Sequence, residues 1–325
     1  MMTARETTVL VAGSANLDFV VRATHVPAPG ETVLGRDFAT FPGGKGANQA
    51  VACARAGAPT QMLLALGTDD HAQAIESSLR RAGVKLHVLR VADQATGTAF
   101  ICLADSAENA ITVAPGANLA LRPPDLPPLE GVSHLLLQLE TPIETVSAFA
   151  RTARAAGVKV VLNAAPAQAL PAAMLAEFDV LIVNEGELAT IAGDHGNVAS
   201  ALAQIDVPCA IVTLGLRGCC ALDRGEFFLQ PGFRVSPVDT TAAGDTFCGA
   251  LVASLSRGAA LPAALRRANA AAALACTRLG AQASIPTADE VDAFLRSDPA
   301  PAVRDEQLGT YCGVGRRSPL LKTRR

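Results

Sequence analysis

Short apolar runs alternate with amphipathic stretches along most of the chain. Runs rich in Val, Leu and Ile, each with the length of a buried strand, occupy 8–12, 63–66, 135–137, 158–162, 180–183 and 210–214. Helical spacing of apolar residues, ending each time at a glycine, occupies 46–56, 70–82 and 143–156. Repeated strand–helix units predict an α/β fold in which helices cover both faces of a mostly parallel sheet.

Two stretches break this rhythm. Residues 17–41 and 96–118 contain short strand-like runs separated by Gly, Pro and Asn, with no helix between them. They predict a small antiparallel sheet inserted into the main domain, which spans 8–297. Such a sheet would act as a lid over a cleft.

Residues 298–325 differ in composition from the rest of the chain. The stretch holds few acids and a group of basic side chains, namely Arg316, Arg317, Lys322, Arg324 and Arg325. It lacks hydrophobic periodicity, so we predict a disordered basic tail. Contact with an anionic partner is the alternative.

Composition narrows the possible partners of the 325-residue chain. The net charge of −3 argues against a nucleic-acid-binding protein, which usually carries a basic excess. The run 134–139 is among the longest apolar ones and is too short to span a membrane, and residues 1–8 do not resemble a signal peptide. We therefore expect a cytoplasmic protein. The eight cysteines form no C-x-x-C pair, which favours reduced thiols over zinc or disulfide sites.

The first candidate site is the run Pro-Gly-Gly-Lys-Gly-Ala-Asn-Gln-Ala at 42–50, directly before a predicted helix. Paired glycines let a ligand approach the backbone, and Lys45 and Asn48 are polar residues at the entry of an apolar helix. The run lacks the spacing of a Walker A loop. A plain tight turn is the alternative interpretation.

The second candidate site is Asp-Thr-Thr-Ala-Ala-Gly-Asp-Thr-Phe at 239–247, which leads into another helix. Small residues at 242–244 would expose N–H groups at the helix N-terminus, where a phosphoryl group could bind. Asp245 could accept a proton from an attacking hydroxyl at the same place. The competing interpretation makes Asp245 an ordinary N-capping residue.

Two further polar groups follow predicted strands. Asn184 and Glu187 come after the strand 180–183, where their oxygens suit Mg²⁺ beside a nucleotide phosphate. An acid-rich first helical turn is the alternative there. Asn16 and Asp18 follow the first strand and point to one face, so both could bind hydroxyls of a polyol; otherwise they are turn residues.

Taken in order, these motifs resemble those of the ribokinase-like family of carbohydrate and nucleoside kinases. The resemblance extends from about residue 8 to 295. It rests on the runs at 42–50 and 239–247, and also on PAPGET at 27–32, APGAN at 114–118, QLE at 138–140, TLG at 213–215 and GAQ at 280–282. The family implies a three-layer αβα domain with a β-sheet lid that often forms a homodimer contact.

The resemblance also implies roles for individual residues. The sugar-binding positions would be Asn16, Asp18, Gly43, Gly44, Lys45, Asn48, Glu140 and Asp245. Catalysis would use Asp245 as the base, with the N–H groups of Ala243 and Gly244 as an anion hole. The ATP-binding positions would be Asn184, Thr213, Gly215, Gly244 and Asn269, and Glu187 would bind Mg²⁺ through water. Asn269 stands where the family often has His.

A monovalent cation, usually K⁺, is a further implication of the family. The matching positions are Asp239, Thr241, Ala275, Arg278, Gly280 and Ser284. The implied reaction transfers the γ-phosphoryl group of ATP to O5 of D-ribose. Deoxyribose, fructose or pseudouridine are alternative substrates, and a non-catalytic sugar sensor or a dehydrogenase are alternatives of other classes. The first strand lacks the G-x-G-x-x-G fingerprint of a dehydrogenase.

Overall fold

A nine-stranded sheet forms the centre of the molecule in this computed structural model, which describes residues 7–106 and 109–315. Its strands lie in the order β13-β12-β11-β10-β9-β8-β1-β4-β5. Their bounds are β1 Thr8–Ala12, β4 Thr60–Leu66, β5 Lys85–Arg90, β8 Val132–Leu137, β9 Lys159–Asn163, β10 Val180–Asn184, β11 Cys209–Thr213, β12 Gly218–Asp223 and β13 Glu226–Pro231.

Most neighbouring strands in this sheet are parallel, as the sequence predicts. The exceptions are β12 with β11 and β12 with β13, which pair antiparallel at one edge. Side chains of β1 are buried on both faces: Val9 and Val11 belong to one core cluster, and Leu10 and Ala12 to the other. A continuous apolar run is therefore the correct sequence signature for these strands.

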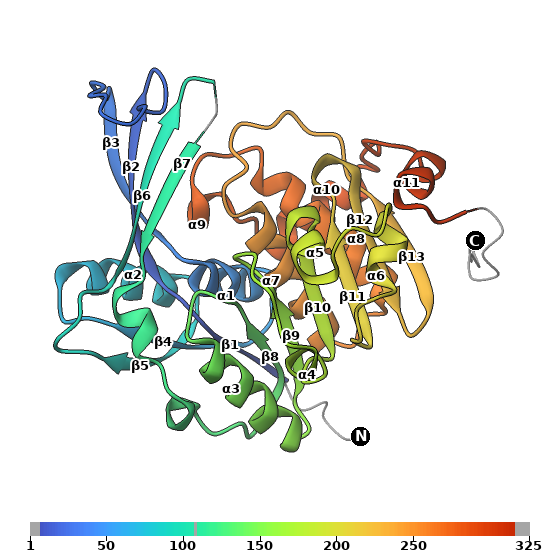
Figure 1. Ribbon diagram of the computed structural model, residues 1–325, viewed down its shortest axis with the longest axis horizontal. Helices are drawn as coiled ribbons and strands as arrows, with labels where there is room; N and C mark the ends of the chain where they lie inside the picture. The colour runs from blue at the N-terminus through green and yellow to red at the C-terminus, as the bar shows by residue number, and fades with distance from the viewer. Residues whose placement is uncertain (1–6, 107–108, 316–325) are drawn as a thin grey trace.

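Helices cover both faces of the sheet and complete a three-layer αβα domain (Figure 1). One core cluster holds side chains of α1 Lys45–Arg55, α2 Asp70–Arg81, α7 Ala243–Ser256, α8 Leu261–Ala275 and α10 Ala288–Arg296. The other holds side chains of α3 Ile143–Ala155, α4 Ala172–Leu175, α5 Glu185–Ala192, α6 Val198–Leu202 and α11 Asp305–Cys312. A short helix, α9 Ala281–Ser284, contacts α1 and the lid.

The lid is a separate four-stranded sheet in the order β3-β2-β6-β7. Its strands are β2 Asn16–Ala23, β3 Asp37–Gly43, β6 Gly97–Ala104 and β7 Asn109–Ala114, and they project from the main domain in Figure 1. The expectation of a purely antiparallel lid is wrong, because β2 and β6 pair in parallel. Between them the chain returns through β4, α2 and β5, so it enters both strands from the same end.

The expectation of a disordered C-terminal tail is wrong for the residues up to 315. Residues 305–312 form α11, in which Leu308 and Cys312 are fully buried in the second core cluster. The segment before it is attached by a β-bridge between Phe233 and Pro301. The prediction failed because two apolar side chains one turn apart are too few to register as periodicity. The basic positions 316–325 lie outside the described residues.

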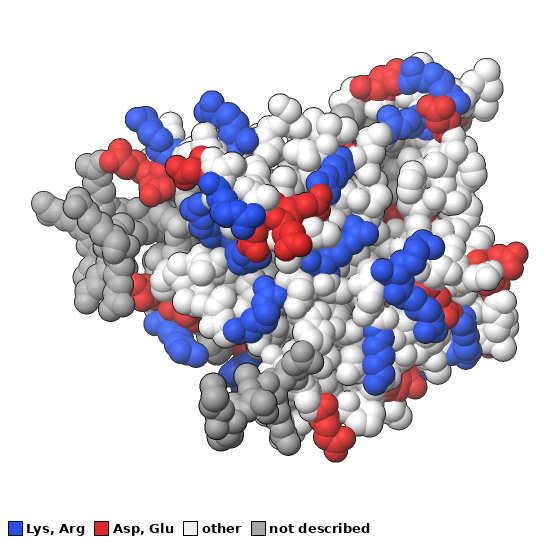
Figure 2. All heavy atoms as spheres, turned by 180° about the vertical axis from the view of Figure 1, so that it is seen from behind, with Lys and Arg blue, Asp and Glu red and all other residues white. Residues whose placement is uncertain are grey.

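Charged side chains of both signs are interspersed on the face in Figure 2, without a large basic area. None of the helices in the described part of the chain is long and apolar enough to cross a membrane. All eight cysteines lie within the described residues and are free thiols, so the prediction of unpaired cysteines is confirmed.

Candidate active site

Two helix N-termini bring the two glycine-containing motifs together. Helix α1 begins after Gly44 and α7 begins after Ala242, and the two helices pack against each other. Asp245, in the first turn of α7, accepts a hydrogen bond from Asn48 Nδ2 at 2.9 Å and another from Gln49 Nε2 at 2.9 Å. Residues almost 200 positions apart thus hold one carboxylate between them.

The N-capping interpretation of Asp245 is wrong. The N-cap position of α7 belongs to Ala242, and no side chain caps the helix there. Instead the Asp245 side chain is buried and faces α1. Burial raises the pKa of Asp245, while the charge of Lys45 and the two amide hydrogen bonds partly offset the rise. A fixed, buried carboxylate with an elevated pKa is well suited to accept a proton.

The backbone at the start of α7 leaves two donors free. Ala242 adopts a left-handed conformation with φ 59° and ψ 12°, which turns the chain sharply into the helix. In the described part of the chain, the N–H groups of Gly244 and Asp245 have no hydrogen-bond partner, whereas Ala243 N–H donates to the Thr240 carbonyl at 3.2 Å. The free donors at this helix end are therefore those of Gly244 and Asp245, and not the predicted pair of Ala243 and Gly244. They favour an anion.

A buried amide chain behind Asp245 was missed by the sequence reasoning. Gln49 Nε2 donates to both Asp245 and Asn163, and Gln49 Oε1 accepts from Gln138 Nε2 at 2.7 Å. Gln49 and Gln138 are fully buried. Both residues stand inside the quoted family runs, but side chains that contact each other across 89 positions leave no local pattern. These hydrogen-bonded amides fix the Gln49 side chain, which in turn orients the Asp245 carboxylate.

The sugar-side residues predicted from the sequence lie at the base of the lid. Asn16 and Asp18 are buried on β2, beside Gly43 on β3. A Cβ on Gly43 would lie 2.1 Å from Asp18 Oδ2, so any other residue there would displace the Asp18 carboxylate. Gly44 has φ 87°, which glycine adopts most readily. The two glycines let the chain at the end of β3 pass close to the polar side chains of β2.

Asn118 is a second residue that the predicted site lacked. Its Nδ2 donates to Asn16 Oδ1 at 2.8 Å, and its Oδ1 accepts from Ala15 N–H at 2.9 Å. It thereby fixes the direction in which the Asn16 amide points. The APGAN run at 114–118 contained the signal, but only as part of a family pattern.

Four carboxylates and one lysine set the electrostatics of the site. Burial and the nearby charges of Glu140 and Asp245 raise the pKa of Asp18 to about 7. Burial by itself would lower the pKa of Lys45. The negative charges of Asp245, Glu140 and Glu187 outweigh the effect of burial, so the pKa of Lys45 is raised. Glu140 Oε2 accepts from Ser14 Oγ at 2.5 Å and from Lys45 N–H at 3.2 Å. The site thus holds more negative than positive charge.

A cavity of about 160 Å³ opens beside Asp245 at the carboxyl ends of β9, β10 and β11. Its lining includes Lys45, Asn184, Glu187 and Thr213 together with the start of α7. Asn184 Oδ1 accepts from Glu187 N–H and Glu187 Oε2 accepts from Asn184 N–H, so the acid-rich first turn is also a capping box. The alternative interpretation, an acid-rich first helical turn, therefore holds, and the same two residues also line the cavity.

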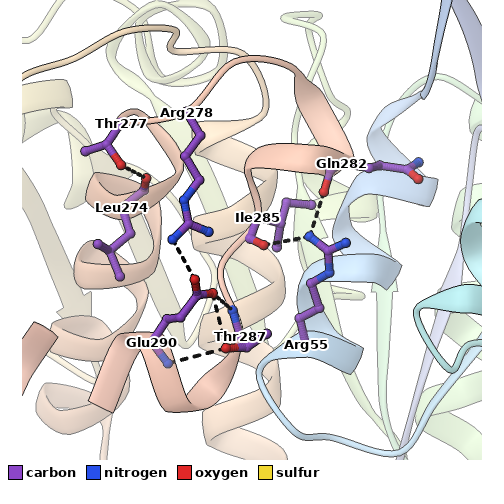
Figure 3. A network of polar contacts seen from close by, with 8 residues as sticks. All are labelled: Arg55, Leu274, Thr277, Arg278, Gln282, Ile285, Thr287 and Glu290. Carbon is purple, nitrogen blue, oxygen red and sulfur yellow. Dashed lines mark hydrogen bonds and ion pairs between the residues drawn. The ribbon is translucent and has the colours of Figure 1, made fainter. Parts of the chain in front are cut away.

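The residues predicted for a monovalent cation lie in two adjacent segments. Asp239 Oδ1 accepts from Thr241 N–H and Oγ–H, and Asp239 Oδ2 accepts from Gly280 N–H at 2.9 Å. The Arg278 side chain extends to Glu290 at 2.6 Å (Figure 3), so this residue could contribute only its backbone. Ala275 and Ser284 are buried in the second segment.

Two residues predicted to bind ATP lie outside the lining of this cavity. Gly215 is in a short 3-10 turn after β11. Asn269 is buried on α8, where its Nδ2 donates to Leu265 O and Cys219 Sγ.

Comparison with known proteins defines the class. Residues 6–288 match the pfkB family of carbohydrate kinases, and the chain belongs to that family. It is 38% identical over 300 residues to ribokinase of Haemophilus influenzae, covering 89% of this chain and 98% of that protein. A deoxyribokinase of Salmonella typhi is 32% identical over 300 residues, covering 88% and 98%.

A solved relative is similar in three dimensions. The structure of Arabidopsis thaliana ribokinase complexed with ribose and ATP is 31% identical, with a TM-score of 0.81 over 89% of this chain and 99% of that one. The α/β architecture and the separate smaller sheet are thus those of the family.

Proposed function

We propose that this protein transfers the γ-phosphoryl group of ATP to O5 of D-ribose. The observation that carries the proposal is the position of Asp245. Its buried carboxylate lies between the polar side chains at the base of the lid and the cavity at the helix N-terminus of α7. The similarity to ribokinases over nearly the whole chain supports ribose as the sugar.

The proposed reaction is a direct in-line transfer. Asp245 accepts the proton of the ribose O5 hydroxyl as O5 bonds to the γ-phosphorus. The bond from that phosphorus to the bridging oxygen breaks, and ADP leaves. Each Asp245 oxygen accepts one amide hydrogen bond and keeps further lone-pair capacity for this proton. The free N–H groups of Gly244 and Asp245 face the developing negative charge.

We assign binding of the sugar hydroxyls to Asn16, Asp18 and Asn48. We assign binding of the transferring phosphoryl group to Lys45. Lys45 lines the cavity beside Asp245, and the surrounding carboxylates keep it protonated by raising its pKa. Asn118 and the Gln49 amide are positioning groups in this scheme, since each acts through another side chain.

Mg²⁺ fits the residues around the cavity. Burial and the charge of Asp245 raise the pKa of Glu187, and a divalent cation would relieve that excess of negative charge. Glu187 would hold the ion through water, near Asn184. When bound, Mg²⁺ neutralises charge on the ATP phosphates.

K⁺ fits the paired segments 239–241 and 275–284. Burial tends to raise the pKa of Asp239, but the hydrogen bonds from Thr241 and Gly280 outweigh it and lower the pKa, so a carboxylate joins the segments. Backbone carbonyls and hydroxyls nearby would supply the remaining ligands, consistent with Asp239, Thr241, Ala275, Arg278, Gly280 and Ser284. A bound cation would stabilise the turn that leads into α7.

Deoxyribose is the second candidate substrate, because a deoxyribokinase is among the relatives. The two sugars differ by one hydroxyl. A buried polar group left without that hydroxyl would weigh against the deoxy sugar. Asn16 and Asp18 are the buried polar groups at the sugar end of the site.

The test is ADP release with ATP and Mg²⁺ across D-ribose, deoxyribose, fructose and pseudouridine, with K⁺ or Na⁺. We expect the highest kcat/KM for ribose and a higher rate in K⁺. Preference for another sugar would overturn the ribose assignment and keep the kinase. No turnover by folded protein that binds ribose would favour a sensor.

A further inference from the structure

A second cavity lies between the lid and the main domain. Its volume is about 380 Å³, and it is lined by the end of β3, by α1, by the C-terminal turn of α2 and by α9. The lining residues are Phe41, Pro42, Arg55, Ser78, Arg81, Ala82, Gln282 and Ala283. None of them lines the cavity beside Asp245, so the two cavities are separate.

Positive charge in this second cavity is not balanced by ion pairs. Within the described residues, neither Arg55 nor Arg81 forms an ion pair, and no carboxylate lines the cavity. Burial lowers the pKa of the Arg55 guanidinium, and the charge of Glu290 only partly offsets this. A half-buried cation of this kind is stabilised by an incoming anion.

Arg55 is also fixed in place. Its Nη1 donates to the carbonyl oxygens of Gln282 at 2.7 Å and Ile285 at 2.6 Å (Figure 3). The rest of the guanidinium makes no hydrogen bond in the described part of the chain. A preorganised guanidinium loses little conformational freedom when it binds an anion.

Gln282 supplies the observation that points to a ligand. Its side-chain Nε2 is buried without a hydrogen-bond partner, and the residue is only 5% exposed. Its Oε1 accepts from Ser78 Oγ at 2.6 Å, which fixes the amide at the cavity wall. An unpaired buried donor is costly, and natural proteins satisfy most of them.

We propose that this cavity, between β3 and α9, binds a small organic anion through a phosphate or carboxylate group. The anionic group would accept hydrogen bonds from Arg55, Arg81 and Gln282. The apolar part of the ligand would lie against Phe41, Pro42 and Ala283. Bidentate recognition by arginine suits either anionic group.

The position of the site relates it to the lid. Pro42 directly precedes Gly43, which lies against Asp18, and Gln282 is two residues beyond Gly280. A ligand there would contact the lid strand and the main domain at once. Occupancy is therefore expected to restrain the movement of β3 relative to α9.

The test is isothermal titration of the full chain with inorganic phosphate and, separately, with malonate. Both titrations use a saturating ATP analogue with a methylene in place of the β,γ-bridging oxygen, so that the γ-phosphoryl position at 242–245 is occupied. We expect a Kd of about 1 mM or tighter for at least one probe. Arg81→Gln and Gln282→Leu should each weaken it, with Arg81→Gln costing about tenfold or more. Arg80→Gln is the matched control, because Arg80 neighbours Arg81 in α2 but pairs with Glu76 and lines a different cavity.

The outcomes are distinct. Binding of phosphate alone assigns a phosphate ester, and binding of malonate alone assigns a carboxylate. Absence of binding by both probes, or equal binding by Arg81→Gln and Arg80→Gln, overturns the site. Because these are binding measurements, they stand independently of the sugar assay that tests the kinase.

Discussion

The Asp245 carboxylate is the group on which turnover depends in the proposed reaction. Asp245→Asn keeps the size of the side chain but removes the proton acceptor, so we expect kcat to fall by about 10²–10⁴-fold. The new side-chain amide would place an N–H group opposite the N–H donor of Asn48 or Gln49. One hydrogen bond would be lost, so Tm should also fall slightly. Steady-state kinetics and ribose binding by calorimetry check this, with ribose Kd nearly unchanged.

Asp70→Asn is the matched control for that variant, since Asp70 also lies in the first turn of a helix but is exposed. It should leave kcat unchanged. An Asp245→Asn enzyme with wild-type kcat would remove Asp245 from the mechanism.

Asp18 should reduce the stability of the protein above neutral pH. Its pKa rises from 3.8 to about 7 in the folded chain, so the native state binds an extra proton between these values. Stability from this group is complete below pH 3.8 and is lost as the pH rises to about 7. Asp18→Asn removes the buried charge, so it should raise the free energy of unfolding at pH 8 and raise it less at pH 5.

Urea unfolding at the two pH values measures this difference, and Asp37→Asn on the exposed part of β3 is the control. The same Asp18→Asn variant should bind ribose more weakly, because a carboxylate acceptor is lost. An equal change in stability at both pH values would show that the Asp18 charge is not buried as the structure indicates.

At the scale of an element, the first turn of α7 keeps space open for a ligand. A Cβ on Gly244 would meet no atom within 4 Å, and its φ is not positive. Gly244→Ala should therefore fold normally and gain about 0.5–1 kcal/mol in stability, because glycine is less stable than alanine in a helix. The added methyl projects beside the free N–H groups, so kcat/KM for ATP should fall.

Thermal unfolding and ATP kinetics together check the Gly244→Ala variant. Gly186→Ala, in the first turn of α5, offers a comparison at another helix start. Lost stability with retained activity would mean that the space beside Gly244 is not the phosphoryl site.

Helix α11 should stabilise the domain even though its sequence lacks periodicity. Leu308 and Cys312 are fully buried in the second core cluster, so removing the helix exposes the apolar surface against which they pack. Ending the chain after Ser297 should therefore lower Tm by several degrees, since burying a leucine contributes about 1.5–3 kcal/mol. Ending it after Gly315 is the control and should change Tm little, and equal Tm values for both truncations would contradict a structural role.

The sequence predicts elements better than it predicts their contacts. Local periodicity was enough to find six of the nine strands of the main sheet and helices α1, α2 and α3, because each depends on its own apolar spacing. It missed β5, β12 and β13. The parallel pairing of β2 with β6 depends on the path of the intervening chain, and the contact between Gln49 and Gln138 depends on the order of strands in the sheet. Neither leaves a local signal. Motif order located Asp245, but only the fold showed that it is not an N-cap.

At the scale of the whole molecule, the lid exposes several large apolar side chains to solvent. Phe38 is 63% exposed, and Phe100 and Ile111 are each 54% exposed. The sheet register places Phe100 with Phe19 on one face, and Ile111 with Ile101 and Val20 on the other. Exposed apolar area on a projecting sheet is typical of a symmetric dimer contact, which we infer here.

Sedimentation velocity tests the inferred dimer with one variant on each face of the lid. We expect wild-type protein to be a dimer, and at least one of Phe38→Lys and Ile111→Lys to be a monomer, because a buried lysine charge opposes association. Leu279→Lys is the control: Leu279 is 57% exposed but lies outside the lid, so this variant should remain dimeric. A wild-type monomer, or a dimer that survives both lid variants, would exclude the lid as the contact. Because Asn16 and Asp18 lie at the base of the same sheet, a variant that separates the subunits should also raise KM for ribose.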